Sequence, residues 1–175
     1  MPIYASASSG TKHTPAPSGS HVGVCVDVID LGVLEVTFGG KTKKQHKIEI
    51  VWQIDETRDD GKPFTVKKRY TLSLHEKAGL RKDLEAWRGR PFTDAELEGF
   101  DVETVIGVGA MLSVIHNVVG TNTYANVNAV MRPAKGMQPP APRDYIRVCD
   151  RTPEQGCEQP EQPPFGGITD DDVPF

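Results

Sequence analysis

The sequence predicts a mainly β fold, a five-stranded barrel with one helix between the third and fourth strands, flanked by disordered tails. Several segments alternate apolar and polar residues with the period of a strand, and one segment has the period of a helix. Both ends of the chain offer little to bury. At 175 residues the chain suits one domain with tails. We therefore expect a disordered segment at 1–20, a domain at 21–135 and a disordered acidic tail at 136–175.

The first strand is expected at residues 21–31, where the sequence HVGVCVDVIDL alternates and places Val22, Val24, Val26 and Val28 on one side. Residues 33–42 either extend this strand or form a loop, and Gly39-Gly40 marks a turn.

Residues 41–74 predict a hairpin of two long strands, because Asp60-Gly61 lies between two β-rich runs. On the first arm, one face carries Ile48, Ile50, Trp52 and Ile54, and the other carries Lys47, Glu49, Val51 and Gln53. On the second arm, one parity carries Phe64, Val66, Tyr70, Leu72 and Leu74, and the other carries Thr65, Lys67, Arg69, Thr71 and Ser73. Each arm thus has an apolar face for a core and a basic face for water or a ligand. Lys68 breaks the pattern, which indicates a bulge or a fraying end.

After the hairpin, the spacing of Leu80, Leu84 and Trp87 predicts an amphipathic helix over 75–89, ended by Gly89 and Pro91. A short second helix is expected in 93–100, capped by Thr93 or Asp94. Strands are expected at 108–119 and 123–132. Beyond 133 only DYIRVCD, at 144–150, has the pattern of a further short strand.

This order of elements is that of the oligonucleotide/oligosaccharide-binding (OB) barrel, whose second and third strands form the usual ligand face. Here those strands are the arms of the predicted hairpin. A small β-sandwich and a generic α+β sheet are the competing folds.

Charge is unevenly distributed along the chain, although the formal net charge is only −4. Residues 20–136 contain sixteen Lys or Arg and sixteen Asp or Glu, whereas residues 137–175 contain three and eight. Clustered lysines can therefore build a positive surface on a neutral body while an acidic tail acts separately.

Neither a membrane span nor a secretion signal is present in the sequence, so we expect a cytoplasmic protein. Its cysteines, Cys25, Cys149 and Cys157, are widely spaced and form no CxxC, which indicates neither a disulfide framework nor a zinc site. We expect no metal and no cofactor.

A groove for single-stranded nucleic acid needs cations along the phosphates and flat side chains for the bases. The hairpin supplies the cations Lys41, Lys43, Lys44, Lys47, Lys67, Lys68 and Arg69. The available aromatic residues are Trp52, Phe64, Tyr70 and Tyr124. Parity favours a core position for the first three and makes Tyr124 the better stacking candidate. A merely solvated basic face is the competing interpretation of the lysines.

The last six residues, DDDVPF, resemble the acidic tip of bacterial and phage single-stranded DNA-binding proteins, which follows a linker rich in Pro, Gly and Gln. The run RYTLSLHEKAGLRKDLEAWRGRPF, residues 69–92, resembles such proteins encoded by tailed phages. The first-strand motif of the bacterial proteins has no counterpart, so their tetramer and their stacking residues do not transfer, and a homo-oligomer is left open.

The resemblance implies an OB fold that coats single-stranded DNA and a tip that recruits replication and recombination proteins. Together with the basic hairpin it gives the candidate DNA-binding residues Lys43, Lys44, Lys47, Trp52, Lys67, Arg69 and Tyr124. The candidate partner-binding tip comprises Asp170, Asp171, Asp172, Val173, Pro174 and Phe175. An apolar cavity beside a basic residue is what such a carboxyl-terminal tip would fit.

Other functions are weighed against this one. No matched nucleophile and base occurs, the five histidines are dispersed, and GVGAML at 107–112 lacks the third glycine of a nucleotide loop, so we expect no enzyme. A recombination mediator or annealing protein and a protein-interaction adaptor without DNA binding remain as alternatives. The tail could also serve only solubility, although solubility does not require a terminal Pro-Phe.

Overall fold

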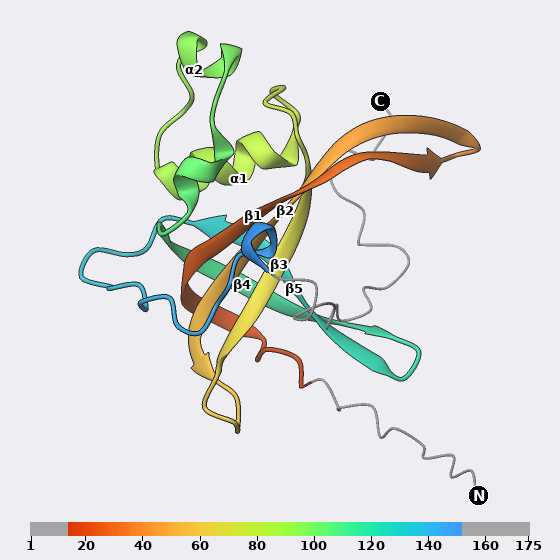
Figure 1. Ribbon diagram of the computed structural model, residues 1–175. Coiled ribbons are helices and arrows are strands. Elements are labelled where there is room, and N and C mark those ends of the chain that lie inside the picture. The colour runs from red at the N-terminus through yellow and green to blue at the C-terminus, as the bar shows by residue number, and fades with distance from the viewer. Residues whose placement is uncertain (1–13, 152–175) are drawn as a thin grey trace, which may run out of the picture.

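The computed structural model describes residues 14–151, which are built around one antiparallel sheet of five strands (Figure 1). The strands are β1 (Gly19–Phe38), β2 (Lys41–Thr57), β3 (Pro63–Thr71), β4 (Gly109–Val119) and β5 (Asn122–Met131). Their order in the sheet is β3-β2-β1-β4-β5. The mainly β fold is therefore confirmed. In the described residues β3 and β5 are not paired by a backbone ladder, but they approach each other where Lys68 Nζ donates to the Asn128 carbonyl at 3.3 Å.

The hairpin of β2 and β3 has the predicted apolar face toward the core, but the prediction of an open polar face is wrong for the middle of β2, where Glu49, Val51 and Gln53 are at most 4 % exposed. Leu72, expected on the apolar face, lies beyond the end of β3 and is 40 % exposed.

The register of the hairpin runs without interruption from the pair Lys47 and Thr71 to the pair Gln53 and Thr65, so the prediction of a bulge or a fraying end at Lys68 is wrong. Lys68 faces inward like Val66 and Tyr70, and its ammonium forms an ion pair of 2.7 Å with Asp83 of α1 (Gly79–Arg88). An inward lysine is tolerated because its long stem carries the charge to a carboxylate.

The core lies between the inner face of the sheet and α1. The isoleucines at 48, 50 and 54 are buried together with Trp52, as parity predicted. The helix contributes Leu80, Leu84 and Trp87, also as predicted, although it begins four residues later than expected. The rings of Trp52 and Trp87 lie 5.9 Å apart, and Trp87 Nε1 donates to the Gly109 carbonyl at 2.6 Å. The two indoles thus tie the sheet to the helix.

The prediction that the four valines of β1 share one side holds for Val24 and Val26 but is wrong for Val28. A register shift between Cys25 and Asp27 interrupts the alternation, and Cys25, not the valines before it, faces Trp52 in the core. Val24 and Val26 form a separate cluster with Val51 on the outer face, whereas Val28, beyond the shift, packs against the core. Strand parity cannot reveal such a bulge, because the extra residue inverts every later position. Gly23 is required here, since a Cβ would lie 2.8 Å from the Gln53 carbonyl oxygen.

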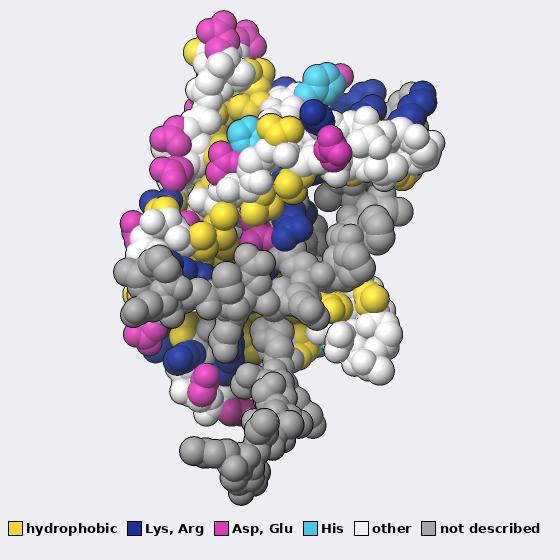
Figure 2. All heavy atoms as spheres, turned by 45° about the vertical axis from the view of Figure 1, so that its right-hand side comes forward, with side chains coloured by type: hydrophobic (Ala, Val, Ile, Leu, Met, Phe, Trp, Pro, Cys, Tyr) yellow, Lys and Arg dark blue, Asp and Glu magenta, His cyan; other side chains and the backbone are white. Residues whose placement is uncertain are grey.

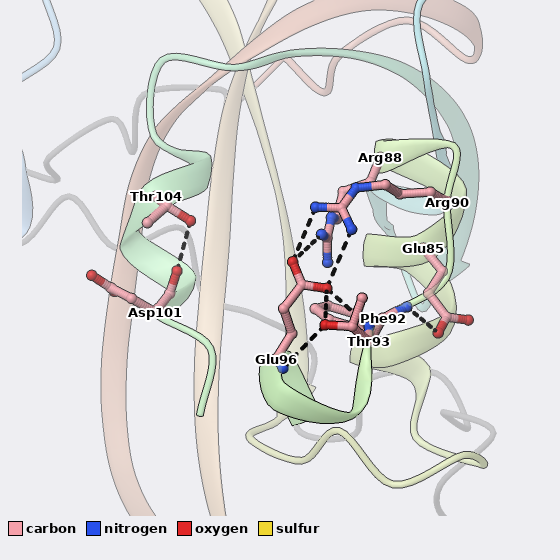
Figure 3. A network of polar contacts seen from close by, with 8 residues as sticks. All are labelled: Glu85, Arg88, Arg90, Phe92, Thr93, Glu96, Asp101 and Thr104. Carbon is pink, nitrogen blue, oxygen red and sulfur yellow. Dashed lines mark hydrogen bonds and ion pairs between the residues drawn. The ribbon is translucent and has the colours of Figure 1, made fainter. Parts of the chain in front are cut away.

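A lobe of α2 (Asp94–Glu98) and the 3-10 helix η1 (Val102–Val105) is fastened to the end of α1 by Glu96 (Figure 3). Glu96 closes a capping box with Thr93, as the cap prediction required, and accepts from Arg88 Nη2 at 2.6 Å and Arg90 Nη2 at 3.0 Å. The Thr93 amide and the two guanidiniums lower the pKa of Glu96 to about 2. The carboxylate therefore holds the lobe from neutral pH far into the acid range.

Residues on both sides of the predicted domain also lie on the sheet. Ala16 is buried, and its carbonyl accepts from His116 Nε2 at 2.7 Å, so the disordered segment expected at 1–20 is wrong for its last residues. Similarly, residues 137–151, expected to be disordered, pack against the fold and include the 3-10 helix η2 (Val148–Asp150) where a strand was expected. Residues 1–13 and 152–175 lie outside the described residues. In the described part, no helix has the length and apolar character needed to cross a membrane.

Candidate nucleic-acid interface

The ends of β1 and β2 continue beyond the sheet as a two-stranded arm, drawn in orange at the right of Figure 1. Residues 33–38 therefore extend the first strand, the first of the two options left open by the sequence. Gly39 and Gly40 have φ of 56° and 77° at its tip. Positive φ at both central turn positions suits glycine, which has no Cβ to clash.

One side of this arm combines cations with apolar side chains. Lys41, Lys43 and Lys47 share a side because β2 has no register shift between them. Lys41 is paired with Phe38 and Lys43 with Val36, so these apolar residues share the same side. The Phe38 side chain is 48 % exposed, and Leu34, on the same side, is 39 % exposed. The side therefore offers both charge and apolar contact to a ligand, and Figure 2 shows Lys and Arg side chains gathered at the end of the arm.

Lys44, also predicted to bind DNA, lies on the opposite side of the arm. Its Nζ is 3.9 Å from a Glu35 carboxylate oxygen, and both side chains are exposed. The structure therefore does not bring Lys44 together with Lys43 and Lys47. Because side chains that follow one another along a strand point to opposite faces, the lysine cluster in the sequence overestimated the size of the basic patch.

Lys67 and Arg69 continue the basic side on β3, and both contact the same carboxylate. Glu49, only 4 % exposed, lies 3.4 Å from Lys67 Nζ and 3.1 Å from Arg69 Nε. The Arg69 side chain remains half exposed. A buried carboxylate between two cations fixes their positions and cancels part of their charge. The sequence placed Glu49 on this face but gave it no role.

Trp52 is removed from the candidate interface. It is fully buried in the core against Trp87, so neither face of its indole is available to a base. Phe64 and Tyr70 are also core residues, as parity favoured. The Tyr70 hydroxyl donates to Asp83 at 2.7 Å, the same carboxylate that pairs with Lys68.

Tyr124 lies on a second projecting hairpin, formed by β4 and β5 and drawn in teal in Figure 1. Its partner across the hairpin is Asn117, and it is partly exposed. Ile115 and Val119, which are 46 % and 44 % exposed, share this side. From 109 to 131 the sequence contains no Asp, Glu, Lys or Arg. This hairpin can therefore offer stacking, apolar and amide contacts, but no charge to a phosphate.

The sequence missed Glu49 as a partner of the cations and missed the apolar side chains of the arm. The role of Glu49 could have been predicted, because its negative charge lies on the same face as Lys67 and Arg69. The arm residues Leu34, Val36 and Phe38 could be placed only once the strand was known to extend past residue 31. The tip at Asp170–Phe175 lies outside the described residues.

A comparison of the chain with models of protein families and with curated protein sequences finds no match.

Proposed function

We propose that this chain is a single-stranded DNA-binding protein with an OB-type domain, which holds exposed strands with little sequence preference. The observation that carries the proposal is the basic side shared by Lys41, Lys43 and Lys47 on β2 and by Lys67 and Arg69 on β3, bordered by exposed apolar side chains. Cations beside apolar surface suit a strand whose phosphates are charged and whose bases are unstacked.

The strand order also supports an OB-type domain. In an OB barrel the helix lies between the third and fourth strands, as α1 does here, and the second and third strands form the ligand face. The approach of β3 and β5 at Lys68 and Asn128 is where such a barrel would close. The cations lie on the strands that this architecture uses for ligands.

The proposed path is matched to an extended strand. Alternate residues on one side of β2 repeat about every 6.8 Å, twice the rise per residue. Lys41 and Lys43 are one such repeat apart, and Lys43 and Lys47 are two repeats apart because Gln45 lies between them, so the three lysines can contact phosphates along an extended strand. Because phosphate contacts carry no sequence information, the proposed complex has little sequence preference.

A titration of dye-labelled oligo-dT and of a matched duplex, followed by anisotropy across a salt series, tests the proposal. We expect tighter binding to the single strand and a steep loss of affinity with salt, because bound lysines release counterions. Equal binding to both, or none at low salt, would reject the proposal and favour the protein-interaction adaptor. Pairing of complementary strands by the bound protein would favour the annealing protein.

Replacing Glu49 with Gln is expected to tighten binding of single-stranded DNA by at most about fivefold at low salt. The change removes a negative charge next to Lys67 and Arg69, and two unit charges 4 Å apart interact by about 1 kcal/mol in water, which is an upper limit because a phosphate on these cations lies farther from Glu49. The same titration measures it. Glu35→Gln is the matched control, since it removes an equal charge on the other side of the arm. An equal gain in both variants would show a general charge effect and no local one.

Replacing Tyr124 with Ala is expected to weaken oligo-dT binding by about tenfold, within the roughly 1–3 kcal/mol that base stacking contributes. Because the phenol is uncharged, the slope of affinity against salt should stay unchanged. Tyr124→Phe keeps the ring and should retain nearly full affinity. A change in salt slope, or an equal loss with Phe, would contradict stacking at this position.

The segment 170–175 is proposed to recruit replication and recombination proteins, since three aspartates followed by an aromatic ring suit a basic pocket with an apolar wall. Deleting Phe175 should leave the affinity for oligo-dT equal or higher, because the acidic tail repels phosphates. A large loss of DNA binding in this variant would contradict the separation of the two roles.

A further inference from the structure

Residues 143–151, hereafter the strap, are fastened to the outer face of the sheet through a buried carboxylate. Asp27 of β1 is 1 % exposed. Its two oxygens accept from the Tyr145 hydroxyl at 3.1 Å, Arg147 Nε at 3.2 Å and the Val148 amide at 2.8 Å. All three of these donors belong to the strap, so its attachment satisfies a carboxylate that the bulge in β1 turns outward.

A second attachment fixes the beginning of the strap. The Gln53 side-chain amide donates to the Arg143 carbonyl at 2.6 Å, and its oxygen accepts from the Arg143 amide at 2.9 Å. Gln53 is 3 % exposed. Both bonds use the backbone of residue 143, so they hold its position and leave its side chain unused.

The contacts beneath the strap make it a permanent part of the fold. Tyr145 packs against the outer cluster of Val24, Val26 and Val51. Burial, followed by the charge of Asp27, raises the pKa of the Tyr145 hydroxyl, which therefore stays protonated as a donor. Removing the strap would expose three valines and leave Asp27 without these donors, so a strap that opens readily is disfavoured.

The strap lies beside the proposed DNA path and leaves the cations of that path accessible. Gln53, which holds the backbone of Arg143, is paired with Thr65. This pair follows the pair Val51 and Lys67 on the same side of the sheet. Arg69 and Lys67 retain exposed fractions of 50 % and 30 %. The sheet has no cation at the pair of Gln53 and Thr65, and the strap supplies one.

The three arginines of the strap have different surroundings. Arg147 is occupied by Asp27 and by Glu103, at 2.7 Å from its Nη2. Arg143 is exposed and, among the described residues, its guanidinium has no ion-pair partner. Arg151 is exposed, its guanidinium lies over the Tyr145 ring at 5.5 Å, and its Nε donates to the Ile146 carbonyl at 3.1 Å. Arg147 thus attaches the strap, while Arg143 and Arg151 are presented at its surface.

We infer that the strap is an additional binding element, in which Arg143 extends the row of cations beyond Lys67 and Arg151 adds a cation above Tyr145, both for further phosphates of the same DNA strand. The inference rests on the proposed function. It assigns to Gln53 the positioning of Arg143, and to Asp27 the attachment of the strap as a whole.

The double variant Arg143→Ala with Arg151→Ala tests this inference in the full chain. The attachments to Asp27 and Gln53 use neither guanidinium, so the strap is expected to stay docked, even though Arg151→Ala removes the contact with the Tyr145 ring and the bond to the Ile146 carbonyl. We expect oligo-dT binding to weaken about tenfold at low salt and the salt slope to fall by about 1.4, since each phosphate contact on a single strand contributes about 0.7.

Arg132→Ala with Lys135→Ala is the matched control, because it removes two cations from the chain next to α1, where the Arg132 amide donates to the Ala86 carbonyl. This control should bind like the wild type. An unchanged salt slope in the strap variant would overturn the inference, and so would tighter binding, which would identify the strap as a competitor of DNA. Absence of DNA binding by the wild type would instead reject the proposed function itself.

Discussion

Replacing Lys43, Lys47, Lys67 and Arg69 together with Ala is expected to weaken binding of single-stranded DNA by on the order of 100-fold at about 0.1 M salt. The expected decrease in salt slope is at most about 2.8, because each phosphate contact on a single strand contributes about 0.7. Glu49 already cancels part of the charge of two of these residues, so the measured decrease should be smaller. Titrations of oligo-dT across a salt series measure both quantities.

A sharper comparison uses two neighbouring lysines. Lys43→Ala should lower affinity, whereas Lys44→Ala should have little effect, because the two side chains leave opposite sides of the arm. The variants have the same charge and adjacent positions, so a difference between them reports the side of the strand. Equal losses would contradict the assignment of the DNA path to one side.

Replacing Trp52 with Ala is expected to lower the free energy of unfolding by about 3–5 kcal/mol. The indole is fully buried against Trp87, so its removal leaves a cavity between the sheet and α1. Urea denaturation followed by far-ultraviolet circular dichroism measures the change. Trp52→Phe should cost less, since it keeps an aromatic ring in the site.

The same variants separate a core role from a stacking role. Under conditions where Trp52→Phe remains folded, its affinity for oligo-dT should equal that of the wild type. A large loss of DNA affinity with unchanged stability would return Trp52 to the interface and contradict its burial.

The sequence predicted the core face of the β2–β3 hairpin well because the register has no shift from the pair Lys47 and Thr71 to the pair Gln53 and Thr65. Ile48, Ile50 and Ile54 face the core as alternation required. On the first strand the prediction failed for Val28, because the register shift between Cys25 and Asp27 inverts the parity, and the core side before the shift carries Gly23 and Cys25. Small residues that face inward do not stand out as an apolar face in the sequence, yet they allow strands to approach closely.

The candidate interface was predicted in part. Lys43, Lys47, Lys67 and Arg69 lie on one side as strand parity implies, and the exclusion of Lys44 follows from the same rule. The docking of the strap was not predictable from local sequence pattern, since its hydrogen-bond acceptor Asp27 lies 120 residues before Arg147. Proline and charge in 137–151 indicated disorder, but specific hydrogen bonds to distant side chains fix this segment.

The packing of Trp52 against Trp87 also determines what the intrinsic tryptophan fluorescence of the protein reports. These are the two tryptophans of the chain, and both are buried in the core. Their spectrum should therefore shift to the red when the core opens in denaturant. Quenching on addition of DNA would signal rearrangement inside the domain, because the indoles have no exposed face on which a base could lie.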